Sequence, residues 1–286
     1  RPPRSTPLYS SAASDVYKRQ PPIRLATWNI NSVRLRIELV AKLAREQKID
    51  VLCLQETKVA DAHFPHKDIG KMGFEHIAIN GQKGYHGVAI LSRLPFSKVD
   101  AKAFCDKGDA RHLRVTLPGE IEVHNFYVPA GGDIPDPDES EKFAHKLQFL
   151  DEMEQYFSKM KSKRTGRRVV VGDLNVAPFE HDVWSHKQLL NVVSHTPTET
   201  ERMARVYAAH DWIDVTRSFV PRDQKAFSWW SYRNQDWKVS DRGRRLDHVW
   251  VSPALDGAVN KHTILKAARD WERPSDHVPV IVEIAA

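Results

Sequence analysis

The stretch VVVGDLNVAP, residues 169–178, runs from three consecutive valines into Gly172 and then into two polar side chains, Asp173 and Asn175. Three apolar β-branched residues predict a buried strand, and the glycine marks its end. Asp, Asn, Gly and Pro also form ordinary turns. The other interpretation is that Asp173 and Asn175 project from a rigid strand end into a cleft. The rest of the chain has to decide between these two interpretations.

Strands and helices alternate along the chain from Ile23 onward, because apolar runs alternate with apolar residues at helical spacing. The expected strands cover residues 23–28, 50–56, 87–92, 111–117, 122–128, 169–173, 246–252 and 277–284. The expected helices cover residues 36–47, 140–161 and 199–210. No linker or repeat divides this pattern, so we expect one α/β domain over residues 21–286.

The composition of the 286 residues is that of a globular protein, with 41% hydrophobic and 28% charged residues. No apolar run approaches the roughly 18 residues of a membrane span, so no membrane partner is expected. The two cysteines, Cys53 and Cys105, make no disulfide framework and favour a reducing compartment.

Residues 1–20 match nothing that follows them. SSAASDVYKRQ, residues 10–20, resembles the in-frame translation of a transposase-type sequencing adapter, and residues 1–6 resemble the primer before it. We expect this segment to be an artefact and disordered. Its four basic residues against Asp15 supply half of the formal net charge of +6. Global charge is therefore a weak indication of a nucleic-acid partner.

Polar side chains stand where many of the expected strands start or stop. They are Asn29 and Asn31, Glu56, Tyr127, Asp173 and Asn175, and the pairs Asp247–His248 and Asp276–His277. If these strands share one sheet rim, oxygen and imidazole groups gather in a single cleft. Hard oxygen ligands suit Mg²⁺ or Mn²⁺, which favours metal-assisted hydrolysis of a phosphoester.

The chain resembles the exonuclease III type of apurinic/apyrimidinic endonuclease from Ile23 to nearly its last residue. The matching motifs, in order, are ATWNINSVRLR (26–36), LQETKV (54–59), GQKGYHGVAILS (81–92), NFYVPAGG (125–132), VVVGDLNVAP (169–178), FSWWSYR (227–233), RGRRLDHVWVS (242–252) and PSDHVPV (274–280). The resemblance implies the four-layer α/β sandwich of the endonuclease/exonuclease/phosphatase superfamily, with two packed, mainly antiparallel β-sheets flanked by helices.

The resemblance also implies a divalent metal, Mg²⁺ or alternatively Mn²⁺. Glu56 would bind it. The alternative is that Glu56 only caps a strand end in solvent, but its place in the motif QETK favours metal binding. The implied metal-binding residues are Asn29, Glu56, Asp173, Asn175, Asp276 and His277, with Asn31 as a further candidate.

The implied catalytic residues are Tyr127, Asp173, Asn175, Asp247 and His277. Asp173 would activate or position the attacking water, with Asn175 fixing water and phosphate. Asp247 would orient His277 against the scissile phosphate, and the Tyr127 hydroxyl would contact the same phosphate. A phosphodiester is so inert that such a site must supply on the order of 20 kcal/mol, which explains the crowding of groups.

The implied DNA contacts are Lys83, Tyr85, Arg111, Trp229, Arg244 and Leu246. The first three are candidates for phosphate contacts, and Trp229 and Leu246 match the pocket for a flipped-out, baseless sugar. Two positions depart from the family. Ala130 replaces a frequent Gln or Asn, and Arg244 replaces a frequent apolar residue of the pocket.

These features predict a metal-dependent DNA repair nuclease. It would cut double-stranded DNA 5′ to abasic sites, leave a 3′-hydroxyl, and act as a 3′–5′ exonuclease and 3′-end-cleaning enzyme. The alternatives are a less specific nuclease, another phosphodiesterase of the superfamily, or a catalytically dead nucleic-acid-binding relative. A dead relative would lack part of the catalytic set, which is complete here. We expect a monomer in the cytoplasm, of bacterial type.

Overall fold

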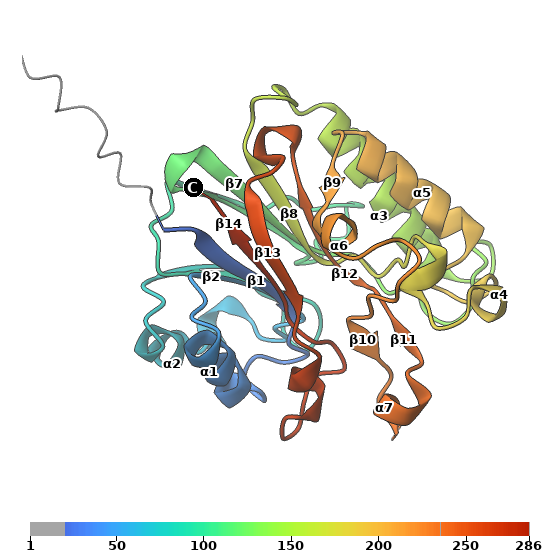
Figure 1. Cartoon of the computed structure of the whole chain (residues 1–286), viewed down its shortest axis with the longest axis horizontal. Helices are drawn as coiled ribbons and strands as arrows, with labels where there is room; N and C mark the ends of the chain where they lie inside the picture. Colours follow the sequence, from blue (N-terminus) through green and yellow to red (C-terminus); the bar gives the residue numbers. More distant parts are fainter. Residues whose placement is uncertain (1–20, 235, 286) are drawn as a thin grey trace, which may run out of the picture.

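Two six-stranded β-sheets pack face to face at the centre of the protein, in a computed structural model that describes residues 21–234 and 236–285. The adapter-like segment 1–20 lies outside the described residues. Figure 1 shows α1 (Ile37–Glu46) and α2 (His66–Lys71) over one sheet, and α3 (Glu141–Ser158) and α5 (Pro197–Ala208) over the other. The predicted four-layer α/β sandwich is therefore confirmed.

The first sheet has a parallel pair of strands at its centre and antiparallel neighbours outside it. The parallel strands are β1 (Ile23–Asn29) and β2 (Val51–Gln55), and α1 connects them. The sheet order is β13 (Val259–Ile264), β14 (Val280–Ile284), β1, β2, β4 (Val88–Ser92) and β3 (His76–Asn80). A parallel pair needs such a crossover, whereas the antiparallel strands do not.

The second sheet repeats this plan. Its parallel pair is β7 (Ile121–Tyr127) and β8 (Arg168–Asp173), connected by α3. The sheet order is β5 (Lys98–Asp100), β6 (His112–Leu117), β7, β8, β12 (Asp247–Val251) and β9 (Ile213–Asp214). One parallel pair among four antiparallel pairs in each sheet confirms the mainly antiparallel prediction.

The carboxyl ends of both parallel pairs carry the polar residues singled out in the sequence. Asn29 ends β1 beside Gln55, the last residue of β2 before Glu56. Tyr127 ends β7 beside Asp173 of β8, and β12 begins at Asp247 opposite the same aspartate. A single shared sheet rim is therefore wrong, because the polar strand ends are divided between two sheets.

Alternate residues along the central strands face different apolar layers. In β2, Cys53 faces the other sheet and Leu52 packs beneath the helices α1 and α2. In β8, Val171 faces the other sheet and Val170 packs against α3 and α5. Both faces of each central strand are buried, which explains why these strands are continuous apolar runs.

Two fully buried amides cross the interface between the sheets. Gln55 of β2 donates from Nε2 to Asn125 Oδ1 of β7 at 2.7 Å, and to Thr27 Oγ1 at 3.0 Å. Asn125 donates in turn to the backbone oxygens of Leu54 and Ala89, both at 3.0 Å. These bonds fix the position of one sheet on the other. Gln55 directly precedes Glu56, and Asn125 lies two residues before Tyr127.

Several elements were not expected from the sequence. They are β3, β5, β9, β13, the hairpin β10 (Trp229–Trp230) and β11 (Gly243–Arg244), and the helices α2, α4 (His186–Leu189), α6 (Val215–Phe219) and α7 (Trp237–Ser240). The last strand also begins later than predicted, at Val280, just after Pro279, which cannot donate a ladder hydrogen bond. No helix among residues 21–234 and 236–285 is long and apolar enough to cross a membrane.

Gly172→Ala should lower the free energy of unfolding by more than about 3 kcal/mol. Gly172 has φ +142°, and a Cβ there would collide with the Phe126 carbonyl oxygen of the neighbouring strand. Urea denaturation measures the loss. Gly257→Ala is the control, because φ is +72° but nothing lies within 4 Å, so only about 1–2 kcal/mol should be lost. Equal effects would show that the strand contact does not matter.

Candidate active site

A cleft of about 490 Å³ opens where the carboxyl ends of the two parallel pairs meet. Most of the predicted site residues line it: Glu56, Tyr127, Asp173, Asn175, Trp229, Arg244, Leu246, Asp276 and His277. Asn29 and Asp247 are fully buried and bind these residues from beneath. The second interpretation of VVVGDLNVAP is therefore correct, because Asp173 and Asn175 enter a cleft.

His277 lies between two carboxylates. Its Nδ1 is 2.8 Å from Asp247 Oδ2, and its Nε2 is 3.6 Å from Asp173 Oδ2. Ser228 donates from Oγ to Asp247 Oδ2 at 2.6 Å and so fixes the buried carboxylate. Burial lowers the pKa of His277, but Asp247 and Asp173 outweigh burial and raise it to about 10. The imidazole is therefore held as a cation at neutral pH.

Three hydrogen bonds fix the Asp173 carboxylate. Asn175 donates to it from its backbone nitrogen at 3.0 Å and from Nδ2 at 3.1 Å, and Asn29 Nδ2 donates at 2.9 Å. Burial, and then the negative charge of Asp247, raise the pKa of Asp173 to about 7, although the positive charge of His277 lowers it. A carboxylate with a pKa near neutrality is suited to accept a proton.

Glu56 accepts hydrogen bonds on both carboxylate oxygens. Its Oε1 accepts from Asn29 Nδ2 at 2.9 Å and from the Tyr127 hydroxyl at 2.8 Å, and its Oε2 pairs with Lys58 Nζ at 2.8 Å. Burial raises the pKa of Glu56, but the bonds from Asn29 and Lys58 bring it below its usual value. Glu56 is therefore ionised, as a metal ligand must be.

Lys58, which was not predicted from the sequence, links Glu56 to Asp276 through Asn31. Its Nζ donates to Asn31 Oδ1 at 2.5 Å, and Asn31 Nδ2 donates to Asp276 Oδ1 at 3.3 Å. Trp229 Nε1 donates to Asp276 Oδ2 at 2.9 Å. The only sequence signal for Lys58 is its place two residues after Glu56 in the motif QETK.

The donor set fits a hard divalent cation. Four carboxylates, at Glu56, Asp173, Asp247 and Asp276, gather here, and the ion pairs at this rim are those of Lys58 with Glu56 and of His277 with Asp173 and Asp247 among the described residues. Ligand atoms of Asp173 and Asp247 lie within 4.8 Å of each other, and Asp247 Oδ1 is buried without a partner among the described residues. Carboxylate and amide oxygens with excess negative charge are what Mg²⁺ and Mn²⁺ require.

Asn29 joins carboxylates of the two sheets. Its Nδ2 donates to both Glu56 and Asp173, and its Oδ1 accepts the backbone N–H of Asn31 at 3.1 Å. One lone pair of Oδ1 remains, so binding of a metal by Asn29 stays a prediction. Asn29 acts as a spacer that holds a carboxylate of each sheet at hydrogen-bond distance.

The three predicted phosphate contacts differ in exposure. Lys83 and Tyr85 lie exposed on the loop after β3, and Tyr85 is 71% exposed. Arg111 is buried, donates to Asp109 Oδ2 at 3.0 Å and to the Tyr127 carbonyl at 3.2 Å, and lies over the Tyr127 ring at 4.9 Å. Lys83 and Tyr85 are therefore free to meet a ligand, whereas Arg111 supports Tyr127.

The hairpin β10–β11 forms one wall of the cleft. It pairs Trp229 with Arg244, whose guanidinium lies 5.2 Å from the centre of the Trp229 ring. Arg244 Nη1 donates to the Val193 carbonyl at 2.9 Å and to Ser194 Oγ at 2.8 Å. Leu246 completes this wall.

A buried ion pair, which the sequence did not indicate, lies behind the wall. Lys146 and Glu199 are both fully buried and pair with each other. Lys146 Nζ donates to the Asn175 carbonyl at 2.7 Å and to the Ala130 carbonyl at 3.2 Å, while Glu199 accepts the Ser194 N–H at 2.9 Å. The pair ties Asn175 to the loop that anchors Arg244.

Several residues at the site have left-handed backbone. Asn31, Glu56, Lys58, His86 and Asn175 have φ values of 48°, 50°, 52°, 54° and 53°. Such conformations cost free energy for residues other than glycine and persist where the surroundings enforce them. The surrounding structure therefore holds Glu56 and Asn175 in conformations that direct their side chains into the cleft.

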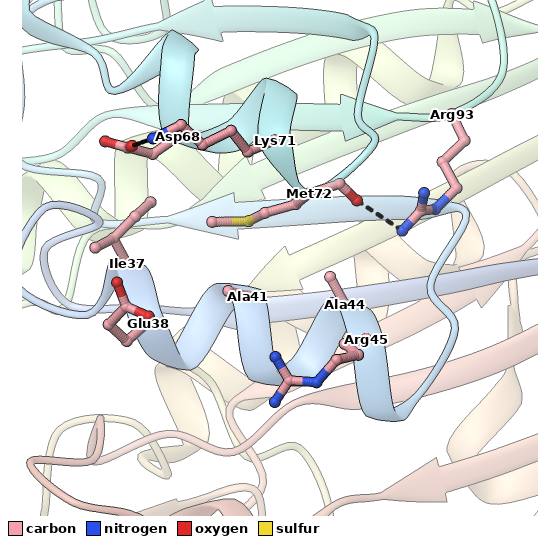
Figure 2. Close-up of a pocket in the computed structure, with 9 residues that line it drawn as sticks. All are labelled: Ile37, Glu38, Ala41, Ala44, Arg45, Asp68, Lys71, Met72 and Arg93. Carbon is pink, nitrogen blue, oxygen red and sulfur yellow. Dashed lines mark hydrogen bonds and ion pairs between the residues drawn. The ribbon is translucent and has the colours of Figure 1, made fainter.

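A second hollow, of about 440 Å³, lies between α1 and α2 (Figure 2). Figure 2 shows Arg93 donating to the Met72 carbonyl, at 2.9 Å, with Glu38 and Arg45 on α1 below. The hollow lies on the helix-covered side of the first sheet and contains none of the predicted site residues. The candidate active site is therefore the cleft between the strand ends.

Residues 26–277 match the Endonuclease/Exonuclease/phosphatase family. The chain belongs to this family. Among family members, exodeoxyribonuclease III of Haemophilus influenzae is 30% identical over 273 residues, which cover 91% of this chain and 99% of that protein. The exodeoxyribonuclease of Bacillus subtilis is 27% identical and aligns with 90% of this chain and 98% of its own.

Solved structures of the family agree with the fold. An AP endonuclease from Archaeoglobus fulgidus has a TM-score of 0.85 at 31% identity, covering 92% of this chain and 100% of that one. A 3′-5′ exonuclease from Neisseria meningitidis has a TM-score of 0.83 at 29% identity, with coverage of 92% and 100%. The protein is a DNA repair nuclease of the exodeoxyribonuclease III type, within the endonuclease/exonuclease/phosphatase family.

Asp247→Asn should lower kcat on duplex DNA by about 100-fold or more, because the amide removes the charge that holds His277 as a cation. Steady-state kinetics with a thermal unfolding control measures this. Ser228→Ala removes the hydrogen bond to the Asp247 carboxylate and the acceptor of the Leu246 and Asp247 N–H groups, but leaves the Asp247 charge, so about tenfold or less should be lost. Wild-type kcat in a folded Asp247→Asn protein would contradict the role of Asp247.

Proposed function

We propose that the protein is a Mg²⁺-dependent nuclease that cuts duplex DNA 5′ to abasic sites and leaves a 3′-hydroxyl. We include 3′–5′ exonuclease and 3′-end-cleaning activity in the proposal. The observation that carries it is the convergence of Asp173, His277 and Glu56 in one cleft beside the wall of Trp229 and Leu246. Mn²⁺ is the alternative metal, since the same oxygen donors suit both ions.

The residues of the first sheet supply the metal site in this proposal. Glu56 and Asp276 would bind the ion. Asn31 lies between them, because it bonds directly to Asp276 and is linked to Glu56 through Lys58. When bound, a divalent cation neutralises the negative charge that builds on the phosphate oxygens. Asp173 and Asn175 border the same space from the second sheet.

Asp173 holds the attacking water in line with the leaving 3′-oxygen and takes its proton. Asn175 fixes the Asp173 carboxylate through two hydrogen bonds, so the water has one position. The His277 imidazolium, held by Asp247, donates to a phosphate oxygen as charge develops there. The Tyr127 hydroxyl, bonded to Glu56, lines the same cleft and would contact the same phosphate.

Selection of a baseless nucleotide rests on the wall of the cleft. Trp229 and Leu246 offer apolar surface to a sugar without a base. The same part of the cleft has to exclude a nucleotide that carries a base. Lys83 and Tyr85 are exposed for contact with the DNA backbone. Double-stranded DNA containing an abasic site or a 3′ end is therefore the proposed partner.

We further propose that residues 21–286 act as one catalytic unit, as a monomer in the bacterial cytoplasm. A less specific nuclease is the second candidate, because Ala130 lacks the amide that relatives often have and Arg244 puts a charge in the pocket wall. Neither residue belongs to the hydrolytic centre, so both candidates use the same chemistry.

Incision of a duplex with one tetrahydrofuran abasic-site analogue, compared with an intact duplex, tests the proposal. Cutting should require Mg²⁺ and stop with chelator, and Asp173→Asn should slow it at least ~100-fold because the water loses its proton acceptor. Equal cutting of both duplexes would favour the less specific nuclease. DNA binding without cutting would contradict both candidates.

Glu56→Gln should raise the Mg²⁺ concentration for half-maximal rate by about tenfold or more, because a neutral amide replaces a charged metal ligand. A Mg²⁺ titration of the incision rate measures it. Glu38→Gln is the matched control, since Glu38 is an exposed glutamate of α1 outside the cleft. The same Mg²⁺ dependence in both variants would argue against Glu56 as a ligand.

A further inference from the structure

Arg244 is a largely enclosed cation in the wall of the catalytic cleft. Its hydrogen bonds go to neutral acceptors, the Val193 carbonyl and Ser194 Oγ, and both come from Nη1. Among the described residues, its Nε is buried without a partner and its Nη2 has none. Enclosed cations are normally paired with an anion, so Arg244 has charge and donors left over.

The nearby carboxylates do not supply this anion. Glu199 is the carboxylate whose charge acts on Arg244, but it is paired with Lys146 and bonded to Ser194 and Thr196. Burial lowers the pKa of Arg244, against the attraction of Glu199, which agrees with a cation that lacks a full partner. The charge of Arg244 is therefore available to an anionic group of a ligand.

The guanidinium is held in one place before any ligand arrives. The Trp229 ring lies 5.2 Å from it, and the ladder of β10 and β11 pairs the two residues. Val193 and Ser194 fix the other side. A planar guanidinium held in this way recognises carboxylate or phosphate oxygens with little further ordering.

Arg244 lines the same cleft as Asp173 and His277. Its strand partner Trp229 forms a β-bridge with His277, which links Arg244 to the hydrolytic residues through one strand. Small residues, Ala130 and Gly132, line the same space. If the scissile phosphate sits at Asp173 and His277, a second group esterified to that phosphate can extend toward Arg244.

We propose that Arg244 is a specificity-determining residue that binds an oxyanion on this group, so that the enzyme favours 3′ ends blocked by a short anionic fragment over neutral ones. The inference rests on the proposed function. The reaction is the same hydrolysis: the water oxygen bonds to phosphorus, the bond from phosphorus to the 3′-oxygen breaks, and that oxygen takes a proton. The fragment leaves with the phosphate.

Two duplexes with blocked 3′ ends test this inference. One ends in 3′-phosphoglycolate and the other in its amide, 3′-phosphoglycolamide, so the leaving 3′-oxygen is the same and only the carboxylate differs. The wild-type protein should have a higher kcat/KM on the carboxylate. Arg244→Leu should lower the ratio of the two values by about tenfold or more, the worth of a charged hydrogen bond. A fraction of inactive protein lowers both kcat/KM values by the same factor, so it does not change their ratio.

Arg242→Leu is the matched control, because it removes one positive charge two residues away. Arg242 is exposed, lies 4.8 Å from the Trp184 ring, and does not line the catalytic cleft. It should leave the ratio unchanged. Arg244→Lys keeps the charge without the planar fork and should retain part of the preference, which shows that the cation rather than the fold of the wall is responsible.

An unchanged ratio in Arg244→Leu would overturn the inference, and so would an equal fall in Arg242→Leu, which would assign the preference to general charge. An equal loss on both blocked ends and on an internal tetrahydrofuran site would also overturn it, because Arg244 would then only shape the wall. Absence of Mg²⁺-dependent release from either end by the wild-type protein would contradict the proposed function instead.

Discussion

The hydrogen bond between Gln55 and Asn125 is the constraint on which the site depends. It joins the two sheets inside an otherwise apolar interface, where an unpaired amide would be costly. An apolar interface alone tolerates sliding, because dispersion contacts have little direction. The amide pair has direction, so it fixes the offset between β2 and β7. Glu56 follows β2 directly and Tyr127 ends β7, and their hydroxyl–carboxylate bond of 2.8 Å needs that offset.

The hydrolytic centre is built from groups that would repel one another without the two sheets. Asn29 bonds to Glu56 of one sheet and Asp173 of the other, and His277 lies between Asp173 and Asp247. The packing of the core, together with the pairs made by Lys58 and His277, holds this excess negative charge together. The left-handed backbone at Glu56 and Asn175 has the same origin. An anionic substrate and a cation then find a site whose geometry is already set.

The central elements could be predicted because their signals are local. The valines before Gly172 and the apolar run before Glu56 are buried on both faces, so their sequences alone identify strands. The edge strands β3, β5 and β13 were missed because they are partly exposed and carry mixed sequences. The family motifs supplied the predicted catalytic residues, most of which line one cleft, but sequence cannot show which residues touch across the chain. Lys58, Ser228 and the pair of Lys146 and Glu199 therefore appeared only in the structure.

The order of the first sheet has a consequence for biosynthesis. Strand β1, formed from the earliest residues of the domain, lies between β2 and β14, and β14 ends at Ile284. His277 reaches the cleft just before β14 begins. While the ribosome is still making residues before Ile284, β1 has an open edge and the imidazole of the site is missing. A chain that lacks these last residues therefore lacks both the neighbour of β1 and the imidazole of the site.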